Sequence, residues 1–223
     1  MKNKNKTALV LGASGLVGNE LVKMLIKQNV YENIHLLVRK PIENKDMKCN
    51  QHIIDFNKLH EYSKFFQVTD VYCCLGTTIK KAKSKEAFRK VDFGYPLEAA
   101  KLAKENGAEK FLIISAMGAN SKSLIFYNQV KGQLEESLSY LHLPSLHIFR
   151  PSLLLGERDE FRLGEKIASK ASGVLNLIMV GPLRPYKAIE AEKVAVAMAK
   201  IANEDKKGIN IYSSQEIEKI ARG

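Results

Sequence analysis

Thr7-Ala-Leu-Val-Leu-Gly-Ala-Ser-Gly-Leu-Val-Gly18 is the stretch of sequence that decides the fold. Its first five residues are small or apolar and predict a buried strand. The strand runs directly into Gly12, Gly15 and Gly18, and helical periodicity follows from Glu20 to Gln28. A strand, a glycine turn and a helix in this order form the first unit of a dinucleotide-binding fold.

Each glycine of this turn has a mechanical role. Gly12 permits the tight turn out of the strand, Gly15 lets the backbone approach a pyrophosphate, and Gly18 lets the helix lie against the sheet. The N–H groups and the dipole of the helix start attract the phosphate charge. The spacing is GxxGxxG, which differs from the GxGxxG of many dehydrogenases. The candidate cofactor-binding residues of this turn are Gly12, Ser14, Gly15, Leu16, Val17 and Gly18.

Length and composition predict one globular domain. A chain of 223 residues is long enough for one substantial core and too short for two comfortable domains. The apolar content of 45% and the charged content of 26% are typical of a soluble protein. No apolar run approaches the roughly 20 residues that span a bilayer, and we interpret Met1–Lys6 as a solvated tail rather than a signal peptide.

Cysteines and histidines narrow the chemistry further. Of three cysteines, Cys73 and Cys74 are adjacent, so they cannot form a disulfide framework; they fit a buried strand and a cytoplasmic location. The five histidines have no metal-ligand spacing, so we predict no metal site. Neither a GxxxxGK[ST] phosphate loop nor a GxSxG nucleophile elbow is present.

The net charge of +11 raises the question of a nucleic acid partner. Such binding predicts a basic stripe with interleaved aromatic residues, whereas the lysines here are spread along most predicted helices. Only Lys80–Lys90 approaches a cluster. We therefore favour a solvated basic face with some attraction for an anionic cofactor.

The end of the second strand indicates which dinucleotide is used. Ile34–Val38 is a buried strand that ends in Arg39-Lys40-Pro41. NAD-binding folds usually place an acid here for the ribose 2′-hydroxyl, whereas an arginine accommodates a 2′-phosphate. Arg39 and Lys40, helped by the Ser14 hydroxyl, therefore predict NADP(H) over NAD(H). The plain alternative is a solvated strand end.

Two further strand ends supply cofactor contacts. His52–Phe56 reads as a third strand, whose Asp55 and Phe56 lie where they could hydrogen-bond and pack on the adenine; Asp55 could equally cap a helix starting near Lys58. Asp70–Leu75 is a fourth strand. The residues at its end that we expect beside the cofactor ribose are Leu75, Gly76, Thr77 and Thr78. A long helix from Ser84 to Asn106, bent near Gly94-Tyr-Pro96 and capped by Gly107, follows.

The fifth strand and the next helix carry the candidate catalytic residues. Lys110–Ser115 is a strand with Ser115 at its carboxyl end, where open α/β sheets bind ligands. Tyr127 and Lys131 are four residues apart on a helix that runs to about Tyr140, so they share a face. A phenol has a pKa near 10, and a neighbouring ammonium favours the phenolate. Tyr127 is then an acid–base catalyst, Lys131 tunes it and holds the ribose, and Ser115 positions the substrate carbonyl.

These motifs together resemble the short-chain dehydrogenase/reductase superfamily, in the extended or atypical branch that includes NAD-dependent epimerase/dehydratase-like proteins. Within it the chain is most similar to the Tat-interacting-protein-like oxidoreductases, over essentially its whole length. The resemblance implies a Rossmann fold, NADP(H) binding and a Ser–Tyr–Lys site, and the branch also contains cofactor-binding regulators. The motifs that carry it are Gly12–Gly18, Asp55-Phe56, Leu75–Thr78, Ser115, Tyr127 with Lys131, and Phe149-Arg-Pro151.

The C-terminal third completes the predicted sheet. Pro144–Phe149 is a sixth strand, after which Pro151 and the backbone of Leu153 and Leu154 are expected to meet the nicotinamide end. In the resembling families the region at about 152–187 carries the substrate lid. A short helix is expected there near Glu165–Lys170, with Arg158, Arg162 and Arg184 either gripping an anionic substrate or solvated. The remaining predicted elements are a helix at Ile189–Asn203, a strand at Ile209–Tyr212 and a helix at Gln215–Arg222 capped by Ser214.

The sequence thus predicts an α/β protein, a Rossmann-type doubly wound parallel sheet in a single domain over residues 1–223 with a small C-terminal substrate lid. We expect an NADPH-dependent oxidoreductase acting on a small carbonyl or alcohol substrate. The alternative is an NADPH-binding regulatory protein with little or no turnover, which meets a protein partner. Substrate identity and oligomeric state stay open.

Overall fold

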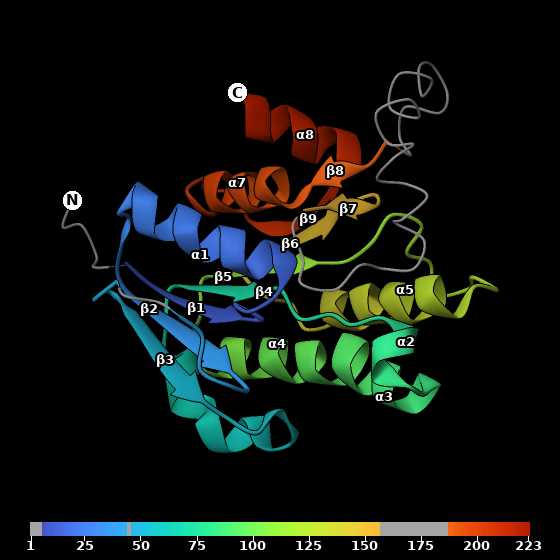
Figure 1. The fold of residues 1–223 in the computed structure, drawn as a ribbon, viewed down its shortest axis with the longest axis horizontal. Coiled ribbons are helices and arrows are strands. Elements are labelled where there is room, and N and C mark those ends of the chain that lie inside the picture. The colour runs from blue at the N-terminus through green and yellow to red at the C-terminus, as the bar shows by residue number, and fades with distance from the viewer. Residues whose placement is uncertain (1–5, 44–45, 157–186) are drawn as a thin grey trace.

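A twisted sheet with helices on both faces forms the protein (Figure 1). The computed structural model describes residues 6–43, 46–156 and 187–223. The strand order is β3-β2-β1-β4-β5-β6-β9, and every neighbouring pair is parallel. This is the order of a doubly wound dinucleotide-binding fold, as predicted. The strands are β1 (Lys6–Leu11), β2 (Tyr31–Val38), β3 (Cys49–Ile53), β4 (Asp70–Cys73), β5 (Lys110–Ile114), β6 (Ser145–Arg150) and β9 (Gly208–Ser213).

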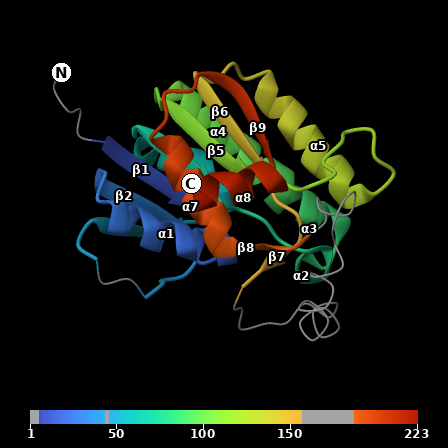
Figure 2. The ribbon, with the colours of Figure 1, turned by 90° about the horizontal axis from the view of Figure 1, so that it is seen from above.

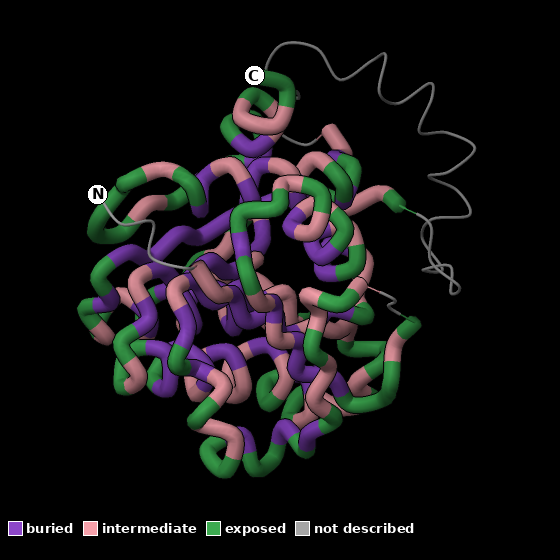
Figure 3. Tube along the Cα trace, turned by 90° about the vertical axis from the view of Figure 1, so that its left-hand side faces the viewer, coloured by how far each residue is buried: buried purple, intermediate pink, exposed green. Residues whose placement is uncertain are grey.

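Two apolar layers hold the helices against the sheet. The first face is covered by α1 (Leu16–Gln28), α7 (Ala191–Ala202) and α8 (Ser214–Arg222), and the second by the 3-10 helix η1 (Phe56–Phe66), α4 (Tyr95–Glu105) and α5 (Phe126–Ser139) (Figures 1 and 2). Alternate strand residues face the two layers; Val10, for example, belongs to the first and Leu9 to the second. The buried positions therefore run through the centre of the molecule (Figure 3).

Small elements gather at the carboxyl ends of the strands. They are α2 (Ile79–Ala82), α3 (Lys85–Arg89), the π-helix η2 (Lys90–Gly94), and a separate two-stranded sheet of β7 (Leu154–Leu155) and β8 (Ile189–Glu190). Within the described ranges, no helix is long and apolar enough to cross a membrane. The predicted lid, including Glu165–Lys170 and the three arginines Arg158, Arg162 and Arg184, lies outside the described residues except at its two ends.

Several predicted boundaries are wrong for identifiable reasons. The third strand ends at Ile53 rather than Phe56, because the Asp55 carboxylate accepts a hydrogen bond from the Asn57 amide at 2.9 Å and caps η1. The fourth strand ends at Cys73, so Cys74 lies beyond it and is half-buried. The terminal helix begins one residue early, because Ser213 rather than Ser214 forms the capping box with Glu216.

The long helix predicted from Ser84 to Asn106 is divided. Helix α3 passes into the π-helix η2 at Lys90, and α4 begins at Tyr95 with Pro96 in its first turn. A π-helical turn, placed just before Pro96, therefore takes the place of the predicted bend. The helix predicted from Ile189 also begins later, at Ala191, because Ile189 pairs with Leu154 in the small sheet. Helix α4 ends at Glu105 with Asn106 as its C-cap, so Gly107, which was predicted as the cap, lies one residue beyond it with a φ of 77°.

Candidate active site

The glycine turn after β1 is packed so tightly that a Cβ atom is excluded at Gly12 and at Gly18. Gly12 has a φ of 86°, and a Cβ atom there would lie 2.6 Å from the carbonyl oxygen of Cys74. A Cβ on Gly18 would lie 2.1 Å from the carbonyl oxygen of Gly12. Both distances are far below van der Waals contact. The two glycines therefore fix the close approach of β1, β4 and α1, as the sequence predicted.

The first turn of α1 is open to an anion. Gly15 is its N-cap and offers no side-chain hydrogen bond, and the first turn carries no acidic residue. The Gly15 amide closes the turn onto the Gly12 carbonyl at 2.9 Å, while Ser14 is exposed beside it. Unpaired N–H groups at a helix start with no competing carboxylate fit the diphosphate of a dinucleotide. The chain also returns here, because Gly156 lies against the Leu16 side chain.

The expected adenosine end lies where β2 and β3 finish. Arg39 and Lys40 are exposed directly after β2. Burial and then the Asp55 carboxylate raise the pKa of the Tyr95 hydroxyl, whereas the Arg39 guanidinium lowers it. Arg39 and Asp55 therefore both act electrostatically on Tyr95. Phe56 is only 5% exposed and packs 5.6 Å from the Tyr95 ring, centroid to centroid. Phe56 thus belongs to the core and presents little surface on which an adenine could stack.

The loop after β4 is tied to a residue that the sequence did not single out. The Thr77 amide donates a hydrogen bond to Asp92 Oδ2 at 2.8 Å, and a Cβ on Gly76 would lie 3.5 Å from Asp92 Oδ1. Thr78 caps α2 by accepting from the Lys81 amide at 3.1 Å. The Leu75–Thr78 loop is therefore held in place by Asp92 on η2. π-helical turns of this kind often occur at functional sites.

Asp92 also binds Lys131. Their atoms Oδ1 and Nζ are 2.8 Å apart, and the side chains are 1% and 3% exposed. Burial disfavours the ammonium, but the Asp92 carboxylate and then Tyr127 outweigh burial, so the pKa of Lys131 lies above its usual value. Lys131 is therefore a buried cation with a dedicated counter-charge. The sequence signal for Asp92 was weak, since a single acid in an amphipathic helix usually faces solvent.

Tyr127 lies one turn before Lys131 on α5 and is half-buried. Its ring packs 5.6 Å from that of Phe88, on α3. Phe88 is fully buried, so it fixes one side of the tyrosine. The predicted pairing of Tyr127 with Lys131 is thus consistent with their places on one helical face and with the electrostatic influence of Tyr127 on Lys131.

Ser115 engages a different partner. Its hydroxyl donates a short hydrogen bond to Glu135, which lies one turn after Lys131 on α5. Arg150, at the end of β6, donates to both oxygens of Glu135, from Nε at 3.1 Å in each case. The structure thus gives Ser115 and Lys131 separate carboxylates, Glu135 and Asp92. The spacing Tyr127, Lys131, Glu135 is a continuous i, i+4, i+8 stripe, which could have signalled Glu135 in the sequence.

The expected nicotinamide-end residues form a framework between β6 and β8. The Pro151 carbonyl accepts from the Met117 amide at 2.9 Å, and the Leu153 carbonyl accepts from the Ile189 amide at 2.9 Å. Leu154 pairs with Ile189 in the small sheet. The carbonyls of Pro151 and Leu153 therefore already accept hydrogen bonds from the protein. The Leu153 side chain is 43% exposed.

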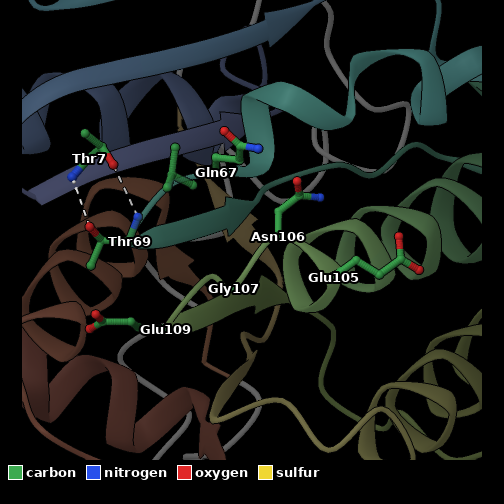
Figure 4. Close-up of a pocket in the computed structure, with 8 residues that line it drawn as sticks. Thr7, Gln67, Thr69, Glu105, Asn106, Gly107 and Glu109 are labelled. Atoms are coloured by element: carbon green, nitrogen blue, oxygen red, sulfur yellow. Dashed lines mark hydrogen bonds between the residues drawn. The ribbon is translucent and has the colours of Figure 1, made fainter.

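A hollow of about 700 Å³ lies at the opposite edge of the sheet, between the starts of β1, β4 and β5 and the end of α4 (Figure 4). Thr7 and Thr69 bridge it, each amide donating to the other's hydroxyl at 3.2 and 3.3 Å. Its described lining includes Glu105 and Glu109 and no lysine or arginine. An acidic hollow at the amino edge does not fit an anionic cofactor, since open α/β sheets bind ligands at the carboxyl edge.

Comparison with known proteins finds relatives in sequence and in fold. The sequence model described as the NAD dependent epimerase/dehydratase family matches residues 8–145. Protein HTATIP2 of Rattus norvegicus is 41% identical over 178 residues, covering 78% of this chain and 73% of that protein. The mitochondrial protein FMP52 of Debaryomyces hansenii is 34% identical over 202 residues, covering 86% and 87%.

Solved structures share the architecture at low sequence identity. UDP-glucose 4-epimerase of Thermotoga maritima, solved with UDP-glucose, superposes with a TM-score of 0.68 and 15% identity, covering 97% of this chain and 81% of its own. MoeE5, solved with UDP-glucuronic acid and NAD, superposes with a TM-score of 0.72 and 14% identity, covering 92% and 75%. At this identity the likeness concerns the fold.

Proposed function

The chain belongs to the NAD dependent epimerase/dehydratase family, and we propose that it is an NADPH-dependent oxidoreductase acting on a small carbonyl or alcohol substrate. One observation carries the proposal. The glycine turn and the start of α1, which has no side-chain cap, follow β1, and the Tyr127–Lys131 face lies on the helix that follows β5, so all three belong to the carboxyl ends of the neighbouring strands β1, β4 and β5. This is the edge where doubly wound sheets bind dinucleotides.

The cofactor assignment has two parts. A nicotinamide dinucleotide is supported by the family and by the NAD held in MoeE5. The preference for NADPH rests on Arg39 and Lys40, which stand where an acid holds the ribose 2′-hydroxyl in NAD-binding folds. Gly12, Ser14, Gly15, Leu16, Val17 and Gly18 would hold the diphosphate.

The protein's own residues then act on the substrate. The reduced dinucleotide, when bound, supplies a hydride to the carbonyl carbon. Tyr127 donates the proton to the carbonyl oxygen, and Lys131 holds the ribose beside it. Because the Ser115 hydroxyl donates to Glu135, its oxygen is free only to accept a hydrogen bond. We therefore assign Ser115 to hold a donor, such as the product hydroxyl, rather than to stabilise an oxyanion.

Titration with NADPH and NADH, followed by nicotinamide fluorescence, tests the cofactor assignment. We expect Arg39→Ala to weaken NADPH binding about tenfold or more and to leave NADH binding nearly unchanged, because only NADPH carries the 2′-phosphate. Lys27→Ala, an exposed residue in the last turn of α1, is the matched control and should change neither. Equal losses for the two dinucleotides in Arg39→Ala would count against the assignment.

Turnover separates the enzyme from the second candidate, a cofactor-binding regulator. That candidate is favoured by one observation: Lys131 and Ser115 are both committed to buried carboxylates. The test follows NADPH oxidation with a panel of aldehydes and ketones. The enzyme predicts turnover that is lost in Tyr127→Phe and kept in Tyr140→Phe, an exposed tyrosine just beyond α5. Tight binding with no turnover across the panel would favour the regulator.

The proposal also covers the protein's binding partners and its location in the cell. We expect a small-molecule substrate, leave a protein partner open for the regulator, and assign no nucleic acid or membrane partner. A cytoplasmic location is proposed although the FMP52 relatives are named mitochondrial. Microscopy of the tagged protein in its native host distinguishes the two compartments.

A further inference from the structure

A cluster of basic residues covers the short helices at the carboxyl edge of the sheet. We call it the basic rim; its members are all exposed and are Lys80, Lys81, Lys83, Lys85, Arg89 and Lys90. The same stretch contains one acid, Glu86. Among the described residues, no ion pair is found for Lys80, Lys83 or Lys90. Cations grouped in this way create a positive potential that attracts anions.

The basic rim is fixed to both sides of the candidate active site. Helix α2 begins directly after the Leu75–Thr78 loop, because Thr78 accepts a hydrogen bond from the Lys81 amide at 3.1 Å. On the other side, the Phe88 ring of α3 lies 5.6 Å from the Tyr127 ring, centroid to centroid. Helices α2 and α3 therefore lie beside the start of α5, which carries Tyr127 (Figures 1 and 2).

Two cations of the basic rim are held in place by aromatic rings. Lys85 Nζ lies 5.3 Å from the ring centroid of Phe126, in the first turn of α5. The Arg89 guanidinium lies 4.5 Å from the ring centroid of Phe93 and donates to Gln133 Oε1 at 2.6 Å. A side chain that is already held loses less conformational freedom when it binds a ligand. The guanidinium also keeps further N–H donors, which suit the oxygens of a phosphate.

The other cations beside Tyr127 are already paired. Lys131 is 3% exposed and lies 2.8 Å from the Asp92 carboxylate. Arg150 forms an ion pair with Glu135. A negative charge on the substrate would therefore be met by the basic rim rather than by these two residues.

We propose that the substrate reduced at Tyr127 carries a phosphate group and that the basic rim binds this phosphate. The inference rests on the proposed function and names its substrate class, a phosphorylated aldehyde or ketone. The lysines supply positive charge, and Arg89 supplies a planar set of N–H donors. The phosphate is bound and not transferred, so the hydride and proton transfers are those of the proposed function. The phosphates of the dinucleotide belong to the glycine turn and Arg39, which leaves the basic rim to the substrate.

Binding of glycerol 3-phosphate, which has no carbonyl group, tests the basic rim without cofactor and without turnover. Amide NMR of isotope-labelled protein at constant ionic strength reports where this probe binds. We expect saturable shifts at the amides of residues 80–90, and none with glycerol, which lacks the phosphate. In Lys80→Gln/Lys85→Gln the dissociation constant should rise about fivefold or more, because two cations near the phosphate are lost.

The matched control is Lys101→Gln/Lys104→Gln, which removes two exposed lysines from α4 and should leave the dissociation constant unchanged. Equal losses in the two double variants would overturn the proposal, and so would shifts confined to the glycine turn. Binding of a single-stranded oligonucleotide through Lys80 and Lys85, with no shift from glycerol 3-phosphate, would assign the basic rim to nucleic acid and also overturn it.

Kinetics of the NADPH-loaded protein connect the basic rim to the reaction. The value of kcat/KM should be higher for glyceraldehyde 3-phosphate than for glyceraldehyde, and this ratio should fall about fivefold in Lys80→Gln/Lys85→Gln through the KM of the phosphorylated aldehyde. An unchanged ratio in this variant would overturn the proposal. Reduction of glyceraldehyde by a protein that does not bind glycerol 3-phosphate would refute the phosphate site alone. Binding of glycerol 3-phosphate at the basic rim, in a protein that reduces neither aldehyde, would support the phosphate site and count against the proposed function.

Discussion

Removal of the charge of Glu135 should destabilise the protein less than removal of its partner Arg150. The two side chains form an ion pair in which Glu135 is 8% exposed and Arg150 is 34% exposed. Arg150→Gln removes the guanidinium from a buried carboxylate, and within the described part of the chain the Ser115 hydroxyl is the side-chain donor that remains to it. Glu135→Gln leaves a guanidinium that water can partly solvate. The sizes of the two losses follow from this asymmetry.

Breaking a buried ion pair by removing one partner costs about 3–5 kcal/mol, so we expect about 4 kcal/mol for Arg150→Gln. For Glu135→Gln we expect about 2 kcal/mol, because the exposed part of Arg150 lowers the desolvation cost. The double variant should cost less than the sum of the two, since neither leaves the other charge unpaired. Urea unfolding followed by far-ultraviolet circular dichroism measures these values in a protein without tryptophan.

The exposed pair Arg222–Glu218, at 2.7 Å on α8, is the matched control. Glu218→Gln should cost about 0.5 kcal/mol or less, as an i, i+4 surface pair does. A larger loss for Glu135→Gln than for Arg150→Gln would refute the reasoning from exposure. Additive losses in the double variant would show that the two side chains do not act as a pair.

Three further predictions concern other parts of the fold. Gly18→Ala should cost about 3 kcal/mol and abolish NADPH binding, because its Cβ would lie 2.1 Å from the Gly12 carbonyl oxygen; Gly94→Ala, with no atom within 4 Å, should lose nothing in urea unfolding. Burial, then Lys110 and Lys206, lower the pKa of His147 from its usual 6.5 to about 4. Below pH 6.5 the unfolded protein therefore binds a proton at His147 that the folded protein does not. The free energy of unfolding should fall by up to about 3 kcal/mol from pH 6.5 toward pH 4, and less in His147→Gln; equal falls would contradict this. Burial raises the pKa of the Cys73 thiol to about 12, so native protein should resist iodoacetamide there until unfolded, as mass spectrometry would detect.

The sequence was a good guide wherever local pattern and topology agree. The glycine turn, the parallel strands and the face shared by Tyr127 and Lys131 all follow from periodicity and spacing. The predicted helix boundaries were wrong where a capping residue sets the end of the helix. The hydrogen bond to the Ser213 hydroxyl, for example, starts α8 one residue earlier than predicted. Such choices between neighbouring serines depend on backbone geometry, which a pattern of residue types does not contain.

The partners of the site's carboxylates could not be predicted from the sequence, although the helical spacing of Glu135 after Lys131 places it on the same face. Asp92 lies in the π-helical turn η2, and this turn places its carboxylate inward against Lys131. No pattern in the sequence predicts a π-helical turn there. Glu135 and Arg150 are 15 residues apart and meet because α5 packs beside the end of β6. These contacts changed the hypothesis for Ser115 from a donor to an acceptor.

The most direct test of the account is an NADPH titration of isotope-labelled protein followed by amide NMR. The account predicts that the largest shifts fall on Gly15, Leu16 and Val17 at the start of α1, with further shifts at Arg39 and Thr77, and that NADH produces the first set more weakly. Shifts confined to the hollow around Thr7 and Glu105, or none with either dinucleotide, would contradict the claim that the glycine turn is a cofactor site.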